Sequence, residues 1–379
     1  MSHRPLDPIK KILVAFTIVL ATTAVGTSLA DEARIPIFAP TTITQPGHYI
    51  LTRDITVSGG DVIVINAGNV TFDLDGRTIS SSSTASRLIA IGDGVEDVEI
   101  LNGRLSRGNT GVFYTSGTVG TRLRMERLVI QDTINPIIIN GADYVQMHSC
   151  HIIGGGSTYA VFVLGIGSGS YGGRFTDNVI RDVAGQGLHL QGLSGGEVRG
   201  NLVENFGTLV SAPGIVLSGA AAASYGGNIF ESNIVRSGDG AGIAIFAGPD
   251  NLIMNNVVTG ASGIGINIAT DGNRIIGNVA NRNGLGIRVT STGSPSPTAH
   301  RNIVERNHVE ANVGDGVSIA NVFPGSDYDL IDSNVIAGNG GVGIKFFTST
   351  GNAYRNNMLR NNALGAILGA ATDAGGNIL

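Results

Sequence analysis

The chain has 379 residues, with 24 lysines and arginines against 29 aspartates and glutamates, so its formal net charge is −5. This acidic balance argues against nucleic acid as a partner, because binding to phosphates depends on lysine and arginine. A single cysteine excludes an intrachain disulfide, so the fold must be stabilised by its core alone.

Residues 1–30 are typical of a secretory signal peptide. Two lysines precede an apolar run over 12–25, and the small-x-small triplet at 28–30 is a cleavage pattern. We therefore expect a secreted or periplasmic protein whose single domain spans 31–379. A retained anchor is the alternative, but a run of about 15 residues is short for a bilayer core of about 30 Å, so no stable membrane span is expected.

The next segments predict short strands. A strand follows the Pro-Gly turn at 46–47, and β-branched runs over 62–66 and 70–79 predict wide early turns of a coil. Because the exposed end of a coil of strands would template aggregation, we interpret 31–60 as an N-terminal cap and first turn.

From residue 178 onward one phrase recurs: Asn, two aliphatics, a short Gly/Asn-rich stretch, then Gly-aliphatic-x-aliphatic. A repeat period in the twenties indicates a solenoid. A leucine-rich repeat is the alternative, but its helix in every unit is disfavoured by this Gly-, Asn- and Thr-rich composition. The asparagines of the phrase are Asn178, Asn201, Asn233, Asn256, Asn278, Asn307, Asn334 and Asn357.

One clean turn shows the expected architecture. Residues 242–246 alternate as a strand, 251–255 form a second strand, Asn256 marks a corner, and 257–259 form a third. The prediction is an all-β, right-handed, single-stranded parallel β-helix of about ten to twelve turns, with three short strands per turn. Aliphatic side chains and corner amides should point inward and stack from turn to turn.

The corner phrase, the Pro46-Gly47-His48-Tyr49-Ile50-Leu51 segment and the segment over 70–79 resemble the right-handed parallel β-helix proteins of the pectin lyase-like superfamily. The resemblance covers nearly all of the chain after the signal peptide. Members of that superfamily include polysaccharide lyases, glycosidases, uronate epimerases, phage tailspikes and periplasmic accessory proteins. The specific catalytic motifs of polygalacturonases, pectate lyases and alginate epimerases are missing here.

In that superfamily the Gly-aliphatic-x-aliphatic strands form the sheet that usually carries the cleft, so the x side chains should line it. A lyase acting on a uronate needs a cation or calcium at the carboxylate and a base beside it. Arg288 and Lys345 are candidate catalytic residues, about 10 Å apart with Ser318 between them as a substrate-binding residue. His189, about 19 Å from Arg288, is a third catalytic candidate in a separate subsite. The predicted column is Ile138, Phe162, His189, Val216, Ala244, Gly265, Arg288, Ser318, Lys345 and Ile367.

Two further clusters offer other chemistry. Glu305 and Asp332 fall on adjacent turns of the second strand, a spacing compatible with the paired carboxylates of glycosidases, although such charges are commonly solubility features. In the segment 147–151, alternation points Cys150 inward as a structural residue and leaves His148 and His151 as candidate ligands for copper(I) or zinc.

The leading hypothesis is an exported β-helix protein that acts on or binds an acidic polysaccharide, with lyase or epimerase chemistry and calcium as the candidate cofactor. The sequence leaves open whether it is an enzyme and what its oligomeric state is. One alternative is a non-catalytic exported scaffold or binding protein. Another is a periplasmic accessory protein that handles copper.

Overall fold

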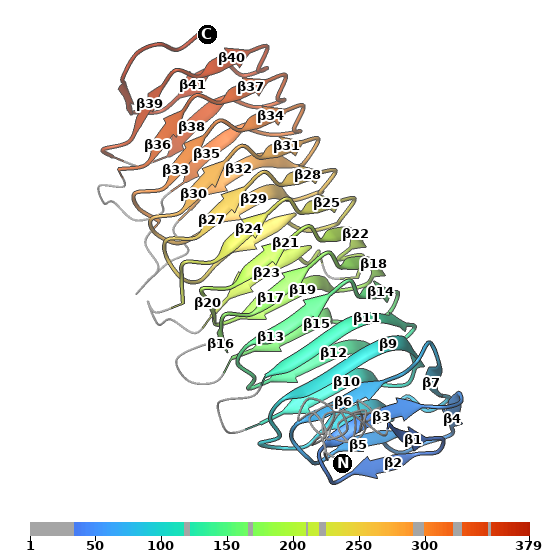
Figure 1. Ribbon diagram of the computed structural model, residues 1–379. Helices are drawn as coiled ribbons and strands as arrows, with labels where there is room; N and C mark the ends of the chain where they lie inside the picture. Colours follow the sequence, from blue (N-terminus) through green and yellow to red (C-terminus); the bar gives the residue numbers. More distant parts are fainter. Residues whose placement is uncertain are drawn as a thin grey trace, which may run out of the picture.

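The computed structural model describes residues 34–116, 122–165, 170–209, 211–219, 225–290, 299–320, 328–347 and 350–379. This part of the chain is an all-β solenoid of about 12 turns whose strands stack in chain order from one end to the other (Figure 1). The predicted fold class is therefore confirmed. The predicted signal peptide lies outside the described residues, and nothing within them forms an apolar helix long enough to cross a bilayer.

One of the three faces of the coil is a 14-stranded parallel sheet, here called sheet B. Its strands from residue 186 onward carry the Gly-aliphatic-x-aliphatic phrases. Its strands are β2 (Thr41–Ile43), β5 (Ile63–Ile65), β8 (Arg87–Ile91), β10 (Thr110–Thr115), β12 (Asn135–Asn140), β15 (Tyr159–Leu164), β19 (Gln186–Gln191), β23 (Ile215–Ser218), β26 (Ile243–Ile245), β29 (Ile264–Ile268), β32 (Leu285–Val289), β35 (Val317–Ala320), β38 (Ile344–Phe347) and β41 (Ile367–Leu368).

The other two faces belong to a 26-stranded sheet that bends at the asparagine corner, because the long strands β9 and β11 run through that corner without a break. The face before the corner is called arm 1. It contains β1 (Ile35–Ile37), β3 (Gly47–Leu51), β6 (Val70–Asp73), the first half of β9 (Val98–Arg107), the first half of β11 (Leu123–Gln131), β13 (Val145–His148), β17 (Arg174–Thr176), β21 (Glu197–Arg199), β24 (Ile229–Glu231), β27 (Leu252–Met254), β30 (Arg274–Ile276), β33 (Ile303–Glu305), β36 (Leu330–Asp332), β39 (Ala353–Arg355) and β42 (Thr372–Asp373).

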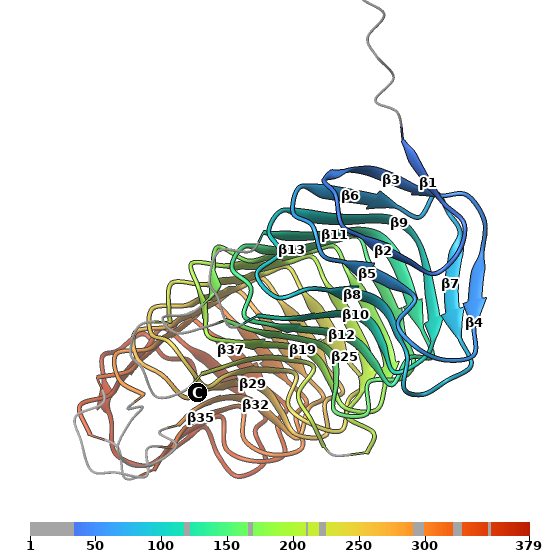
Figure 2. The ribbon, with the colours of Figure 1, turned by 90° about the horizontal axis from the view of Figure 1, so that it is seen from below.

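The face after the corner is called arm 2. Figure 2 shows β4 and β7 of arm 2 closing the side between arm 1 and sheet B. A two-stranded sheet of β16 (Ser170–Tyr171) and β20 (Leu193–Ser194) is added to this framework. Besides the second halves of β9 and β11, arm 2 contains β4 (Ile55–Val57), β7 (Thr78–Ser81), β14 (His151–Ile153), β18 (Val179–Val183), β22 (Leu202–Phe206), β25 (Ile234–Arg236), β28 (Val257–Thr259), β31 (Val279–Asn281), β34 (His308–Glu310), β37 (Val335–Ala337) and β40 (Met358–Arg360).

The predicted asparagine ladder runs along the corner between the two arms. The Asn256 amide nitrogen donates to Asn278 Oδ1 and to the carbonyl oxygen of Phe230, both at 2.9 Å. Its own oxygen accepts from the backbone and side-chain nitrogens of Asn233, also at 2.9 Å. Every hydrogen-bonding group of the buried amide is thereby satisfied, which is what keeps its burial from being costly.

Two further ladders run along the other corners, and the sequence analysis did not predict them. One precedes arm 1 and the other follows arm 2, and both use the same amide-to-amide bonds with donor–acceptor distances near 2.9 Å. The first comprises Asn228, Asn251, Asn273, Asn302, Asp329 and Asn352, and the second Asn283, Asn312, Asn339 and Asn362.

The glycine of each phrase marks a close approach between rungs. A Cβ on Gly242 would lie 2.2 Å from the side chain of Val258 and 2.7 Å from the carbonyl oxygen of Gly265 on the next rung. The chain enters sheet B through a space that admits no side chain. This explains why the phrase begins with glycine on so many turns.

Two positions of the predicted sheet B column are wrong. Ala244 pairs with Asn267 and not with Gly265, because the segment 263–268 contains the phrase twice in overlapping form and the second copy is the one in register. At the C-terminal end Lys345 pairs with Leu368 and not with Ile367. The first assignment was two residues out of register and the second was one residue out, and sequence periodicity alone does not resolve such shifts.

Candidate functional site

The outer column of sheet B brings three of the predicted site residues together. Arg288, Ser318 and Lys345 are paired across β32, β35 and β38. They therefore lie on consecutive rungs as predicted, with Arg288 and Lys345 about 10 Å apart by strand spacing. Asn267, which the sequence analysis missed because of the register error, lies beside Arg288 on the preceding rung.

Arg288 is only partly engaged by the protein. Its Nη2 donates a long hydrogen bond of 3.5 Å to Thr290 Oγ1, and its Nε is buried with no hydrogen-bond partner among the described residues. On the neighbouring rung Asn267 is 7% exposed, and its Oδ1 also has no partner in the described part. Arg288 therefore retains donor capacity, and Asn267 retains acceptor capacity.

Lys345, in contrast, is anchored by its neighbours. Its ammonium lies 3.3 Å from Asp315 Oδ2 and 4.2 Å from the centroid of the Phe347 ring. Asp315 is itself fixed, since it accepts the Val342 N–H at 2.8 Å. Ser318 between the two cations is 2% exposed. Of the two predicted cations, Lys345 has a carboxylate partner and Arg288 has none among the described residues.

His189 occupies the same column four rungs before Arg288, as predicted. It is 8% exposed, and its Nε2 lies 2.6 Å from Ser218 Oγ. The rings of Phe162 and Tyr159 contact it edge-on. Burial lowers the pKa of His189 to about 4, so the imidazole is neutral above that pH. The structure does not bring it together with Arg288.

Buried polar atoms without a partner gather on sheet B. Natural proteins satisfy the great majority of buried polar groups, so such atoms call for an explanation. Their concentration along one outward face makes sheet B the candidate ligand-binding surface. Within the described residues, the sheet B atoms of this kind are Asn140 Oδ1, Gln186 Oε1, His189 Nδ1, Asn267 Oδ1 and Arg288 Nε.

The carboxylates of arm 1 favour a structural role. Glu305 and Asp332 lie on adjacent rungs, as predicted. Glu305 is 2.8 Å from the guanidinium of Arg274, and Asp332 is 2.8 Å from that of Arg355. Burial works to raise the pKa of Asp332, but the hydrogen bonds from Arg355, Ser333 and Asn356 and the charge of Arg355 together outweigh it, so the pKa lies below its usual value. A general acid of a glycosidase needs the opposite shift.

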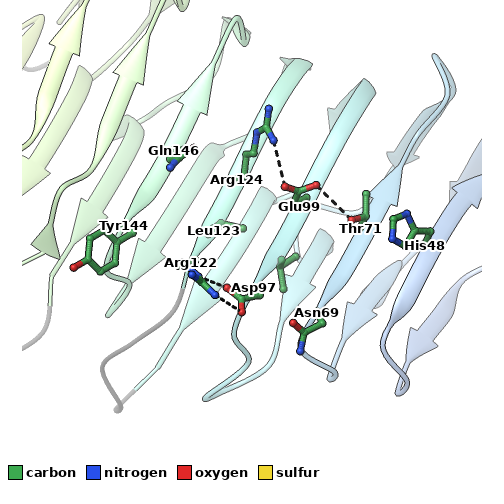
Figure 3. A pocket seen from close by; sticks show the side chains of 11 residues that line it. His48, Asn69, Thr71, Asp97, Glu99, Arg122, Leu123, Arg124, Tyr144 and Gln146 are labelled. Carbon is green, nitrogen blue, oxygen red and sulfur yellow. Dashed lines mark hydrogen bonds and ion pairs between the residues drawn. The ribbon is translucent and has the colours of Figure 1, made fainter.

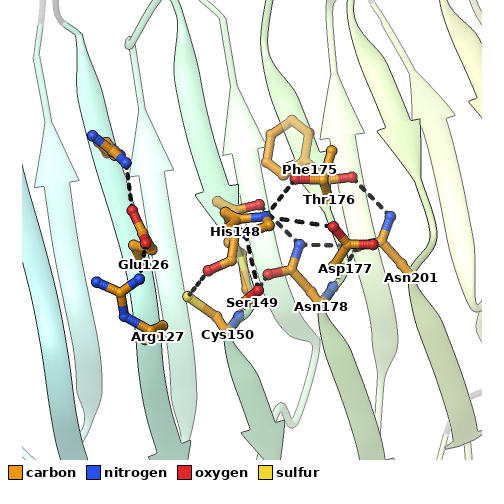
Figure 4. A network of polar contacts seen from close by, with 12 residues as sticks. Glu126, Arg127, His148, Ser149, Cys150, Phe175, Thr176, Asp177, Asn178 and Asn201 are labelled. Atoms are coloured by element: carbon orange, nitrogen blue, oxygen red, sulfur yellow. Dashed lines mark hydrogen bonds and ion pairs between the residues drawn. The ribbon is translucent and has the colours of Figure 1, made fainter.

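The segment around Cys150 crosses the corner between the arms (Figure 4). Cys150 is fully buried at the head of the corner ladder, donating its N–H to Asn178 Oδ1 at 2.9 Å, and burial raises the pKa of its thiol to about 12. His148 and His151 are exposed on β13 and β14, and His148 Nδ1 lies 2.9 Å from Thr176 Oγ1. No group of three potential metal ligands gathers within the described residues, and the role of the two histidines stays a prediction.

Comparisons with known proteins agree with this architecture. Residues 165–322 match a family model described as a right-handed β-helix region. A search of curated proteins finds no significant match. The chain therefore has a right-handed parallel β-helix fold, as the sequence analysis predicts.

Two solved structures illustrate the similarity. One is the catalytic unit of a thermostable GH87 α-1,3-glucanase from Streptomyces thermodiastaticus strain HF3-3, which is 16% identical, covers 91% of this chain and 68% of its own, and superposes with a TM-score of 0.60. The other is a mutant of the periplasmic alginate epimerase AlgG, which is 13% identical, covers 84% of this chain and 77% of its own, and has a TM-score of 0.53. At these sequence identities the similarity shows a shared fold and nothing more.

Proposed function

We propose that the outer face of sheet B binds an acidic polysaccharide, and that Arg288 holds a uronate carboxylate there. The observation that carries this proposal is the half-buried Arg288 guanidinium, whose Nη2 makes one long hydrogen bond of 3.5 Å and whose Nε has no partner among the described residues. A guanidinium is the side chain best suited to a planar carboxylate, and an amide oxygen beside it suits a sugar hydroxyl. That similar folds include an alginate epimerase supports the choice of a uronate.

The chemistry proposed for this face is removal of the proton next to the uronate carboxylate. Arg288 would neutralise the carboxylate, and the Lys345–Asp315 pair is the acid–base group nearest to it along the column. Loss of the neighbouring glycosidic oxygen after proton removal gives a lyase, and return of a proton from the other side gives an epimerase. His189 would line a more distant subsite as a neutral side chain.

A non-catalytic binding protein is the second candidate function. The ammonium of Lys345 is held by Asp315 and the Phe347 ring, which favours a fixed structural cation over a group that exchanges protons. In both candidates the protein works outside the cytoplasm, in the periplasm or secreted, because residues 1–30 read as an export signal.

Turnover assays separate the two candidates. The purified protein is incubated with alginate, pectate and glycosaminoglycans, with and without calcium, while ultraviolet absorbance follows unsaturated uronates and NMR in deuterated water follows exchange at the uronate carbon. A lyase or an epimerase loses its signal in Arg288→Gln and Lys345→Met. A flat result on every substrate, together with retained binding, removes the catalytic candidate and supports the binding protein.

A further inference from the structure

Arm 1 carries a hollow near the N-terminal end of the coil, on a different face from sheet B. Its volume is about 480 Å³, and it lies over β3, β6, β9, β11 and β13 (Figure 3). This hollow is called the arm-1 groove, and it is defined here by Thr71, Asp97, Glu99, Arg122, Arg124 and Tyr144.

The charges in the arm-1 groove cancel in pairs. Arg122 forms a two-pronged ion pair with Asp97, with Nη2 2.7 Å from Oδ2. Arg124 lies 3.3 Å from Glu99 and 2.5 Å from Glu126. A polyanion would meet carboxylates beside each guanidinium, so the groove has no net attraction for it. Hydroxyl groups, which both donate and accept, suit alternating acceptors and donors.

The groove is also elongated along the coil. Register places His48, Thr71, Glu99, Arg124 and Gln146 on five consecutive rungs in one outward column. At the usual strand spacing this column is about 19 Å long. Such a row of polar side chains matches an extended oligosaccharide better than a compact small molecule.

Tyr144 closes the end of the groove farthest from His48 (Figure 3). It is 49% exposed and adopts a left-handed backbone conformation with φ of 49°. Asn69, Asp97 and Gly172 hold the equivalent position on nearby rungs and tolerate this conformation, while the bulky Arg301 and Tyr328 adopt it at the same position on distant rungs. A Cβ on Gly172 would lie 3.1 Å from the Tyr144 ring, so the glycine makes room for it. What distinguishes Tyr144 from Tyr328 is its place in the arm-1 groove.

We propose that the arm-1 groove binds a neutral oligosaccharide. The face of the Tyr144 ring would pack on the apolar face of one sugar, and the paired side chains of Arg124 and Glu99 would bond the hydroxyls of the next ones. This site goes beyond the proposed function, since it uses another face of the coil and a ligand of different charge.

The test is isothermal titration calorimetry of the whole protein with cellohexaose, laminarihexaose and maltohexaose. At least one of these is expected to bind, and Tyr144→Asn is expected to weaken that binding by about tenfold or more, the equivalent of about 1.4 kcal/mol. Asparagine is chosen because Asn69 occupies the same position with the same backbone conformation, so the fold is kept. Tyr144→Phe keeps the ring and should bind as the unchanged protein does.

Tyr328 provides a matched control. It occupies the same corner position on a distant rung of arm 1, is 62% exposed and has φ of 52°, but it does not line the groove. Tyr328→Asn should leave neutral-sugar binding unchanged, and so should Arg288→Gln, which separates this site from sheet B. The proposal is overturned if none of the three hexaoses binds, or if Tyr144→Asn and Tyr328→Asn weaken hexaose binding equally. It is also overturned if Tyr144→Asn weakens uronate binding and leaves hexaose binding unchanged.

Discussion

Single amide groups account for much of the stability of this coil. At Asn256 one side chain bonds the asparagines of the rungs before and after it and a backbone carbonyl of the preceding rung. The recurrence of asparagine at the corner made this ladder predictable, because a buried amide that recurs at every turn has an identical neighbour to bond.

Asn256→Ala is expected to lower the free energy of unfolding by roughly 3 kcal/mol. The change leaves the nitrogens of Asn233, the carbonyl of Phe230 and the oxygen of Asn278 short of a partner, and each buried orphan costs roughly 1–3 kcal/mol. Denaturant unfolding measures the effect. The neighbouring Asn255→Gly is the control, since Asn255 is exposed and in a left-handed conformation that glycine tolerates. Equal shifts in the two variants would contradict the ladder's role.

His189 should make the protein less stable in mild acid. Its pKa is about 4 in the folded protein, against about 6.5 in an unfolded chain. As the pH falls from 6.5 to 4 the unfolded chain takes up a proton that the folded protein does not, so the stability that is complete above pH 6.5 declines in this window by at most about 3 kcal/mol.

The measurement is the unfolding free energy between pH 4 and pH 7 for the unchanged protein and for His189→Gln. Glutamine keeps a polar group near Ser218 Oγ but does not titrate. The variant should show a shallower loss on acidification. Parallel pH profiles for the two proteins would show that burial of the His189 ring does not depress its pKa.

At the scale of the elements, glycine controls how each turn enters sheet B. A Cβ on Gly286 would lie 2.3 Å from both the carbonyl oxygen of Gly316 and the side chain of Val309. Contacts this close leave no room for a methyl group without a shift of the rungs. The phrase is therefore a packing requirement as much as a turn signal.

Gly286→Ala is expected to destabilise the protein by roughly 1–3 kcal/mol, the usual cost of overpacking. Thermal unfolding monitored by circular dichroism measures it. Gly59→Ala is the control, because a Cβ there meets nothing within 4 Å and the backbone conformation is not left-handed. If Gly286→Ala were as stable as Gly59→Ala, the close approach between rungs would not be the reason for glycine in the phrase.

Sequence periodicity predicted the strands well and their register less well. The turn over 242–259 appears as β26, β27 and β28 at the expected residues. Asn267 was missed because two copies of the phrase overlap over 263–268, and alternation fits both. The ladder that contains Asn251 was not predicted, because Asn251 was assigned to the strand over 251–255. Nothing in the sequence distinguishes an asparagine at a corner from one at the end of a strand.

The candidate sites were predictable only where they follow the repeat. The column of Arg288, Ser318 and Lys345 follows from the x position of each phrase. The anchoring of Lys345 by Asp315 comes from a turn and not from a strand, so periodicity did not predict it. The arm-1 groove was missed because it depends on the orientation of corner side chains relative to the sheet, which periodicity does not predict. A tyrosine at this corner was not a distinctive signal, because Tyr328 occupies the same corner position on a distant rung.

At the scale of the whole molecule, two ligand classes are proposed for two faces of one coil. Sheet B carries a cation with donor capacity, which suits an acidic chain. The arm-1 groove carries paired charges and an exposed ring, which suit a neutral one. A protein with both sites would hold two kinds of polysaccharide side by side along its length.

The most direct test of the sheet B assignment is calorimetric titration with oligogalacturonate and oligomannuronate. Arg288→Gln is compared with Arg274→Gln, an arginine of arm 1 that is 2.8 Å from its Glu305 partner. The account predicts that uronate binding falls by tenfold or more, about 1.4 kcal/mol, in Arg288→Gln and is unchanged in Arg274→Gln. Equal binding by both variants, or a loss confined to Arg274→Gln, would contradict it.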